Sequence, residues 1–165
     1  MKITALEEYG LRCMVQLARN HSDSPLTLPE FTKKEGLSTA YAGKLMMILK
    51  KAQLVKASRG RKGGYTLTRS PEEISLNEIF DALGDRLFPT AFCSEHPGVH
   101  KVCINQEDCR VRDIWKNVDS FFGRIFEQIS LADIAEGKLD LLESILTSET
   151  KGKIKPSGDI AIAEN

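Results

Sequence analysis

The sequence predicts a mainly α-helical protein with a small β-wing, built as a winged helix-turn-helix domain plus a long dimerisation helix. Two short helical segments broken at Gly36 precede two alternating strands around a glycine-rich basic loop, which is the order of a winged helix-turn-helix. A long amphipathic run begins at Val111. With 165 residues and 41% hydrophobic content, the chain can hold one domain and an appendage.

Four regions are expected along the chain. Residues 1–86 form a winged helix-turn-helix DNA-binding domain, 87–110 a cysteine loop that binds a cluster, 111–146 the dimerisation helix and a C-terminal helical segment, and 147–165 a disordered tail. No apolar run approaches the ~20 residues that cross a bilayer, and the N-terminus is too acidic for a signal peptide. We therefore expect a cytoplasmic protein with no membrane partner.

The first helix is predicted from its cap and its apolar stripe. Thr4 and Glu7 have the spacing of a capping box, and apolar residues recur behind them at helical spacing until about Arg19. Cys13 lies on that stripe. We interpret it as a small buried hydrophobe and not as a ligand.

Residues 26–55 predict a short helix, a break at Gly36 and a second helix with Ser38 as its N-cap. One face of the second helix is apolar, and this face comprises Ala42, Leu45, Leu49 and Ala52. The polar residues near its N-terminus point away from that face, as in a recognition helix that reads the major groove. The candidate DNA-binding residues here are Ser38, Thr39, Tyr41 and Lys44.

A basic β-wing is predicted directly after the second helix. Val55 and Ala57 alternate on one short strand, and Tyr65 and Leu67 alternate on the next. The loop RGRKGG between them carries three glycines at 60, 63 and 64, which permit the positive φ values of a tight turn. The loop has three basic residues, Arg59, Arg61 and Lys62. We expect them to bind phosphates or to enter a minor groove.

The charge distribution indicates double-stranded DNA as the partner. The chain has no net charge, yet residues 31–69 hold ten lysines and arginines against the single acid Glu35. A basic segment within an acidic remainder attracts phosphates locally without making the whole protein adhesive.

The second half of the chain predicts helices that pack the wing domain and join two subunits. Ser75 and Glu78 form a capping box before an apolar stripe that ends at Gly84. The amphipathic run from Val111 to about Ile129 is too apolar for one chain to bury, so it predicts a homodimer. Ser130 with Asp133 predicts a further capped helix.

Three cysteines in one polar stretch, Cys93, Cys103 and Cys109, are the candidate metal ligands. Thiolates on a short loop suit an iron-sulfur cluster, zinc or copper(I). A structural zinc with His96 or His100 as fourth ligand, or a thiol switch, is an alternative to a cluster. A thiol or zinc enzyme is disfavoured, because the sequence has no HExxH, no P-loop and no obvious base and oxyanion donors.

The sequence LSTAYAGKLMMILKKAQLVKASRGRKGGYTL, the three-cysteine loop and the RDIW that follows it together resemble the Rrf-type winged helix-turn-helix transcription regulators, which include iron-sulfur-binding members. The resemblance covers about residues 1–135. It implies a homodimeric repressor on a palindromic promoter site, with a [2Fe-2S] cluster favoured over [4Fe-4S] on the three cysteines. Redox change, nitric oxide or iron scarcity would then alter DNA affinity.

The chain departs from the family pattern in two places. Nine residues separate Cys93 from Cys103, where cluster-binding relatives have five, and Arg112 stands where some relatives have a ligating histidine. In other relatives an acidic residue near the start of the first helix reaches across the dimer. Glu8 stands at the matching position and is the first candidate for the fourth ligand.

Overall fold

The computed structural model describes residues 3–20, 24–60, 63–84 and 92–138. The predictions for Arg61 and Lys62, for residues 139–146 and for the tail from 147 onward lie outside these ranges. The described elements, in chain order, are α1 Ala5–Arg19, α2 Leu28–Glu35, α3 Thr39–Lys51, β1 Val55–Ser58, β2 Gly64–Leu67, the 3₁₀ turn η1 Pro71–Glu73, α4 Leu76–Leu83, α5 Phe92–Glu95, α6 Arg110–Glu127 and α7 Leu131–Glu136.

Helix α1 begins as its capping box predicts. The backbone N–H of Glu7 donates to Thr4 Oγ1, while the Glu7 carboxylate accepts from the Thr4 N–H at 2.6 Å. Cys13 is fully buried in the main core, and its burial raises the pKa of the thiol to about 12. The interpretation of Cys13 as a core residue is confirmed.

The helix-turn-helix consists of α2 and α3, and Gly36 between them adopts a left-handed φ of 68°. A residue with a Cβ would be strained there, which explains the glycine at the break. The buried face of α3 comprises Ala42, Leu45, Met46 and Leu49. The expectation for Ala52 was wrong, because Ala52 is the exposed C-cap of the helix, and Met46 takes its place in the core.

The wing is an antiparallel pair, β1 with β2, in which Val55 is paired with Leu67 and Ser58 with Gly64. Only Gly60 has the expected left-handed φ, at 105°, and the prediction for the other two described glycines was wrong. Gly63 and Gly64 are needed because a side chain would not fit. A Cβ at Gly63 would lie 2.5 Å from the Ser58 carbonyl oxygen, and a Cβ at Gly64 would lie 2.7 Å from the Leu26 carbonyl oxygen.

One core unites the winged domain. Residues from α1, α2, α3, both wing strands and α4 contribute to it, and so does Leu131 of α7, which is fully buried. α4 crosses α1 closely at Gly10, where a Cβ would lie 2.3 Å from Leu83 Cδ2. Helix α7 is therefore part of the winged domain's core, although it follows the long helix in sequence.

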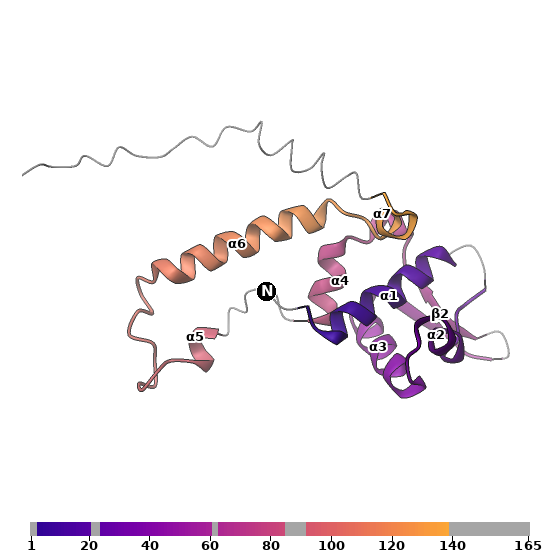
Figure 1. Ribbon diagram of the computed structural model, residues 1–165, viewed down its shortest axis with the longest axis horizontal. Helices are drawn as coiled ribbons and strands as arrows, with labels where there is room; N and C mark the ends of the chain where they lie inside the picture. The colour runs from indigo at the N-terminus through magenta and orange to yellow at the C-terminus, as the bar shows by residue number, and fades with distance from the viewer. Residues whose placement is uncertain (1–2, 21–23, 61–62, 85–91, 139–165) are drawn as a thin grey trace, which may run out of the picture.

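Helix α6 extends from the winged domain to the cysteine segment, which we define as residues 92–109 (Figure 1). Its C-terminal end lies at α7, against the winged domain, and its N-terminal end lies at the segment that contains α5. Within α6 only Ile125 is buried. Along the parts of the chain described, no helix is both long and apolar enough to cross a membrane.

Candidate DNA interface and cysteine segment

The N-terminal end of α3 presents two of the predicted DNA-binding residues to solvent. Ser38 caps the helix, since its Oγ accepts a hydrogen bond from the Tyr41 N–H at 3.2 Å. Thr39 Oγ1 lies 3.4 Å from Thr32 Oγ1 of α2, and both Ser38 and Thr39 are exposed. The Ser38 hydroxyl therefore caps α3, the Thr39 hydroxyl contacts α2, and both residues remain accessible to a ligand.

The sequence pattern suggested that Tyr41 points away from the protein, but the structure shows otherwise. Its ring packs edge-to-face against Tyr9 of α1, with centroids 6.1 Å apart and an interplanar angle of 89°. The side chain is half-buried beside the main core. The ring therefore joins α3 to α1, and only part of it is accessible to DNA.

An exposed stripe on α3 includes a residue that the sequence analysis missed. Ala40, Lys44, Met47 and Lys51 are exposed and follow one another at helical spacing, opposite the buried face. Met47 is 66% exposed. The run LMMIL made Met46 and Met47 equivalent in hydrophobicity, and only the register of the helix shows which of them faces outward.

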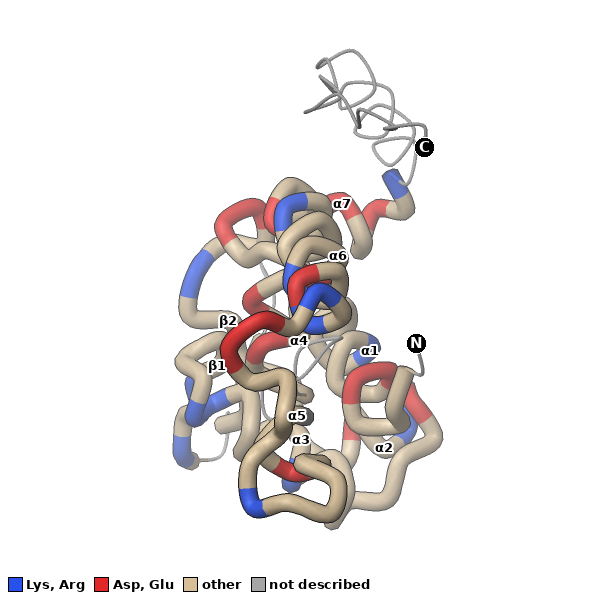
Figure 2. Tube along the Cα trace, turned by 90° about the vertical axis from the view of Figure 1, so that its left-hand side faces the viewer, with Lys and Arg blue, Asp and Glu red and all other residues tan. Residues whose placement is uncertain are grey.

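The described part of the wing presents basic side chains on one side of the molecule. Arg59 and Lys56 are exposed on or beside β1, and lysine and arginine positions gather near the wing at the lower left of Figure 2. Arg69, which contributed to the basic window in the sequence, is instead bound to Glu78 of α4 at 2.8 Å. The basic surface is thus made by fewer residues than the charge count suggested.

All three candidate cysteine ligands are half-buried and free of disulfide bonds. Cys93 lies in the short helix α5, where a loop was expected, so that part of the loop prediction was wrong. Cys109 is the N-cap of α6, and its Sγ accepts a hydrogen bond from the Arg112 N–H at 3.4 Å. Both histidines of the enlarged spacer, His96 and His100, are exposed.

Arg112 connects Cys103 with Cys109. The Gln106 N–H donates to the Cys103 carbonyl at 3.1 Å, and Arg112 Nη1 donates to the Gln106 carbonyl at 2.7 Å. Arg112 Nε is buried and has no hydrogen-bond partner among the residues that the structure describes. The two cysteines therefore belong to one turn, held by the first turn of α6.

Glu8 lies in the first turn of α1, where its carboxylate pairs with Arg12 Nε at 2.9 Å. Over the described residues, no three histidine, cysteine, aspartate or glutamate side chains lie close enough together to hold one metal ion. The thiols and the orphaned Arg112 Nε–H suit an anionic iron-sulfur group by their chemistry. Their arrangement in one chain does not assemble the ligand sphere.

Comparison with known proteins gives relatives of one kind over most of the chain. Residues 3–137 match the family described as Rrf2, iron-dependent transcriptional regulator. The protein Rrf2 of Nitratidesulfovibrio vulgaris is 28% identical over 134 residues, covering 81% of this chain and 87% of the relative. The regulator IscR of Aliivibrio salmonicida is also 28% identical, over 81% of this chain and 77% of its own.

Solved structures agree with the sequence relatives. The global cysteine regulator CymR of Bacillus subtilis superposes with a TM-score of 0.65 at 28% identity, covering 82% of this chain and 97% of CymR. T. potens IscR gives a TM-score of 0.65 at 27% identity, covering 86% and 90%. The predicted winged-helix fold is confirmed, and these relatives are transcription regulators and not enzymes. This chain belongs to the Rrf2 family of DNA-binding transcription regulators.

Proposed function

We propose that this regulator is a homodimeric repressor that acts in the cytoplasm on a palindromic promoter site, and that an iron-sulfur cluster on the cysteine segment controls its DNA affinity. The observation that carries the proposal is the course of α6. Cys109 is the N-cap of α6. The C-terminal end of α6 is followed by α7, whose first residue, Leu131, lies in the winged domain's core. A change in the cysteine segment therefore bears on the helix that enters the DNA-binding domain.

The uncovered apolar face of α6 supports the homodimer. Val111, Ile114 and Trp115 are 61%, 57% and 47% exposed, and Phe121 is exposed as well. A single helix face with so many large apolar side chains in water is unfavourable, at roughly 25 cal/mol per Å² of apolar surface. A second copy of the same helix, related by a twofold axis, would cover it.

The DNA interface we propose combines the exposed stripe of α3 with the wing. Thr39 and Lys44 would contact base edges and phosphates, and Met47 would make apolar contact with a thymine methyl group. Arg59, Arg61 and Lys62 would bind the backbone or a minor groove beside the wing. Ser38 would hold the start of the recognition helix, and its hydroxyl group would donate a hydrogen bond to a phosphate.

The proposed cluster ligands are Cys93, Cys103 and Cys109, with Glu8 of the second subunit as candidate for the fourth. When bound, a [2Fe-2S] or [4Fe-4S] cluster would supply a group sensitive to redox change and nitric oxide. For Glu8 to serve, its ion pair with Arg12 would have to open. The cysteine segment would have to close, because the three thiols are not gathered in the single chain.

The test is anaerobic purification of the full chain, with counts of iron, acid-labile sulfide and zinc and a visible absorption spectrum. We expect a brown protein with matched iron and sulfide. Replacing any one of the three candidate cysteines with alanine should abolish the colour. Cys13→Ala is the matched control, because that cysteine lies in the core, and it should leave the iron content unchanged.

The same preparation decides whether the cluster controls DNA binding. Duplexes selected from a random-sequence pool are titrated with loaded and cluster-free protein, and we expect their dissociation constants to differ at least fivefold. Equal affinities would contradict control by the cluster. Failure to select any duplex in either form would contradict the proposed DNA interface.

A thiol switch is a second candidate, favoured by the structural likeness to CymR of Staphylococcus aureus, which is 26% identical and was also solved in an oxidised form. Two of the three thiols would form a disulfide, losing two protons and passing two electrons to an external oxidant. A colourless, metal-free protein whose DNA affinity changes with diamide would support this alternative. Tightly bound zinc, with His96 or His100 as fourth ligand, would indicate a structural site.

A further inference from the structure

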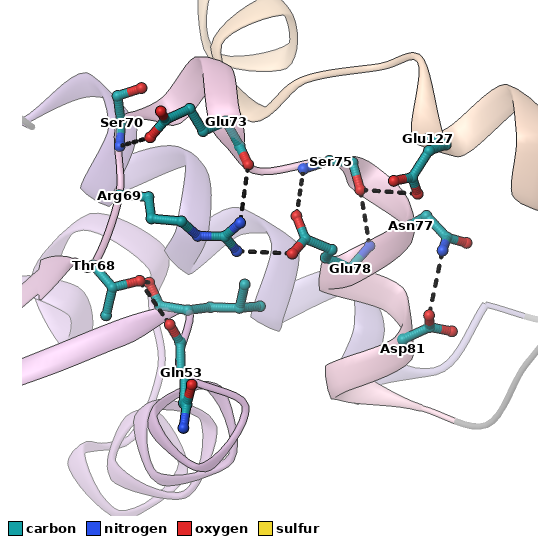
Figure 3. A network of polar contacts seen from close by, with 11 residues as sticks. Gln53, Thr68, Arg69, Ser70, Glu73, Ser75, Asn77, Glu78, Asp81 and Glu127 are labelled. Carbon is teal, nitrogen blue, oxygen red and sulfur yellow. Dashed lines mark hydrogen bonds and ion pairs between the residues drawn. The ribbon is translucent and has the colours of Figure 1, made fainter.

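A set of hydrogen bonds in two groups, joined through the peptide bond between Thr68 and Arg69, connects the end of the recognition helix with the end of α6 (Figure 3). It begins at the turn after α3, where Thr68 Oγ1 donates to the Gln53 carbonyl at 2.6 Å and the Thr68 N–H donates to the Leu54 carbonyl at 3.1 Å. Gln53 has a left-handed φ of 60°. Thr68 directly follows β2, so the same residue fixes the base of the wing to the end of α3.

Arg69 continues the set from the wing to α4. Its Nη2 binds Glu78 Oε1 at 2.8 Å, and its Nη1 donates to the Glu73 carbonyl at 3.2 Å. Both contacts use the guanidinium group, whose planar shape suits two acceptors at once. The Arg69 side chain is thereby held against α4 and η1.

Ser75 carries the set from α4 to α6. Its N–H donates to Glu78 Oε2 at 3.0 Å, and its hydroxyl donates to Glu127 Oε2 at 3.3 Å. The backbone reinforces this contact, since the Leu76 N–H donates to the Ile129 carbonyl at 2.8 Å. Glu78 thus accepts from Arg69 on one oxygen and from Ser75 on the other.

We propose that Arg69 is a positioning residue of the DNA interface, and that Arg69, Glu78, Ser75 and Glu127 make the wing follow the position of α6. Arg69 orients the wing relative to the recognition helix and does not itself bind DNA. Glu127 is the α6 end of the same connection. This inference goes beyond the proposed function, because it concerns how the wing is held whether or not a cluster is present.

The nature of the Arg69 contacts separates it from the phosphate-binding residues of the wing. Arg59 is exposed and has no ion pair among the described residues. The logarithm of the affinity falls as the logarithm of the salt concentration rises, and each phosphate contact makes this slope steeper by about 1. Loss of a positioning residue lowers the affinity and leaves that slope unchanged.

The first experiment titrates full-length variants against a duplex selected by the wild-type protein. We expect Arg69→Gln to weaken binding about fivefold with an unchanged salt slope, and Arg59→Gln to lower the slope by about 1. The doubly exchanged variant, Arg69→Glu with Glu78→Arg, should recover part of the lost affinity. A lower salt slope for Arg69→Gln, or no loss of affinity, would overturn the assignment.

The second experiment needs no DNA and no cluster. Backbone hydrogen exchange of residues 64–69 is measured in Glu127→Ala and in the control Glu136→Ala, which removes an exposed acid that pairs with Lys138. We expect several-fold faster exchange at 64–69 only in Glu127→Ala. Faster exchange confined to residues 74–76 and 127–131 would show that the connection ends at Ser75 and would refute the proposal. This outcome is separate from failure of the cluster or the DNA interface.

Discussion

The Leu131 N–H donates a hydrogen bond to the Ile74 carbonyl at 2.8 Å, and the Leu131 side chain is fully buried in the core of the winged domain. On the other side of Ser75, the Leu76 N–H donates to the Ile129 carbonyl at the same distance. Two short stretches, centred on Ser75 and Ser130 and therefore 55 residues apart in the chain, are thus paired like strands. Through this pairing the C-terminal end of α6 is fixed to the DNA-binding domain.

Leu131→Ala should destabilise the winged domain, because it leaves a cavity in the main core. The expected loss is about 2–5 kcal/mol in the free energy of unfolding, measured by urea denaturation. Ile3→Ala is the control, since Ile3 is 55% exposed. A loss below about 0.5 kcal/mol for Leu131→Ala would mean that α7 is not part of this core.

Gly10→Ala should destabilise the crossing of α1 and α4. The added methyl group would lie 2.3 Å from Leu83 Cδ2 and 2.9 Å from its Cγ, and Leu83 is itself buried. We expect a loss of about 1–3 kcal/mol. Gly43→Ala in α3 is the matched control, because its nearest neighbour would lie at 3.8 Å. Helix propensity makes that control neutral or stabilising by up to about 1 kcal/mol.

Cys13 should be unreactive in the native protein, in contrast to the three other cysteines. Its thiol is buried, and burial raises its pKa from 9.0 to about 12. In the metal-free protein, a maleimide reagent at pH 7.5 should label Cys93, Cys103 and Cys109 and reach Cys13 only after denaturation. Rapid native labelling of Cys13, located by mass spectrometry, would contradict its place in the core.

The raised pKa of Cys13 also predicts a loss of stability at alkaline pH. The unfolded chain ionises this thiol above about pH 9, while the folded protein keeps it protonated until about pH 12. The stabilising contribution is therefore complete below pH 9 and declines between pH 9 and 12. Cys13→Ala should be less stable at neutral pH but should lose less stability over that window, as measured by thermal unfolding.

Glu78 predicts a dependence on acidic pH. Partial burial raises the pKa of its carboxyl group. The hydrogen bond from Arg69, the hydrogen bond from the Ser75 N–H and the Arg69 charge together lower the pKa by more, so that it lies below the usual 4.5. Its contribution is present above pH 4.5 and is lost as the pH falls through the folded pKa. Glu78→Gln should lose about 0.5 kcal/mol at pH 7 and less below pH 4. An equal loss at both pH values would argue against the ion pair.

The apolar face of α6 predicts that a charge there separates the subunits. We expect the wild-type protein to form the proposed dimer and Trp115→Glu to be monomeric, because a carboxylate within an apolar interface would lose its hydration. Lys116→Glu on the same helix is the control and should remain dimeric. Sedimentation velocity reads the outcome, and a dimer in both variants would exclude this face as the subunit interface.

Local signals were enough to predict most of the elements. The capping boxes at Thr4, Ser75 and Ser130 each begin a helix where expected, because both partners of such a box lie within four residues of each other. The wing strands followed from alternation, and α6 followed from its apolar periodicity, one residue from its predicted start.

The candidate site was predicted less completely, since it depends on contacts between distant segments. Polarity alone placed Tyr41 on the DNA side, and the charge count included Arg69 in the basic window, whereas Tyr9 and Glu78, which hold them, lie 32 and 9 residues away. Met47 was missed because hydrophobicity does not distinguish it from the buried Met46.

By itself the sequence determined a helix-turn-helix with a basic wing, a cysteine segment and an amphipathic helix, because caps, periodicity and glycine spacing act over a few residues. Only the tertiary structure decided that α7 completes the winged domain's core and that Ser75, already paired locally with Glu78, also binds Glu127. Ser75 and Glu127 lie 52 residues apart in the chain, and Leu131 lies 57 residues from Ile74, whose carbonyl accepts its N–H, so a local pattern carries no information about these contacts.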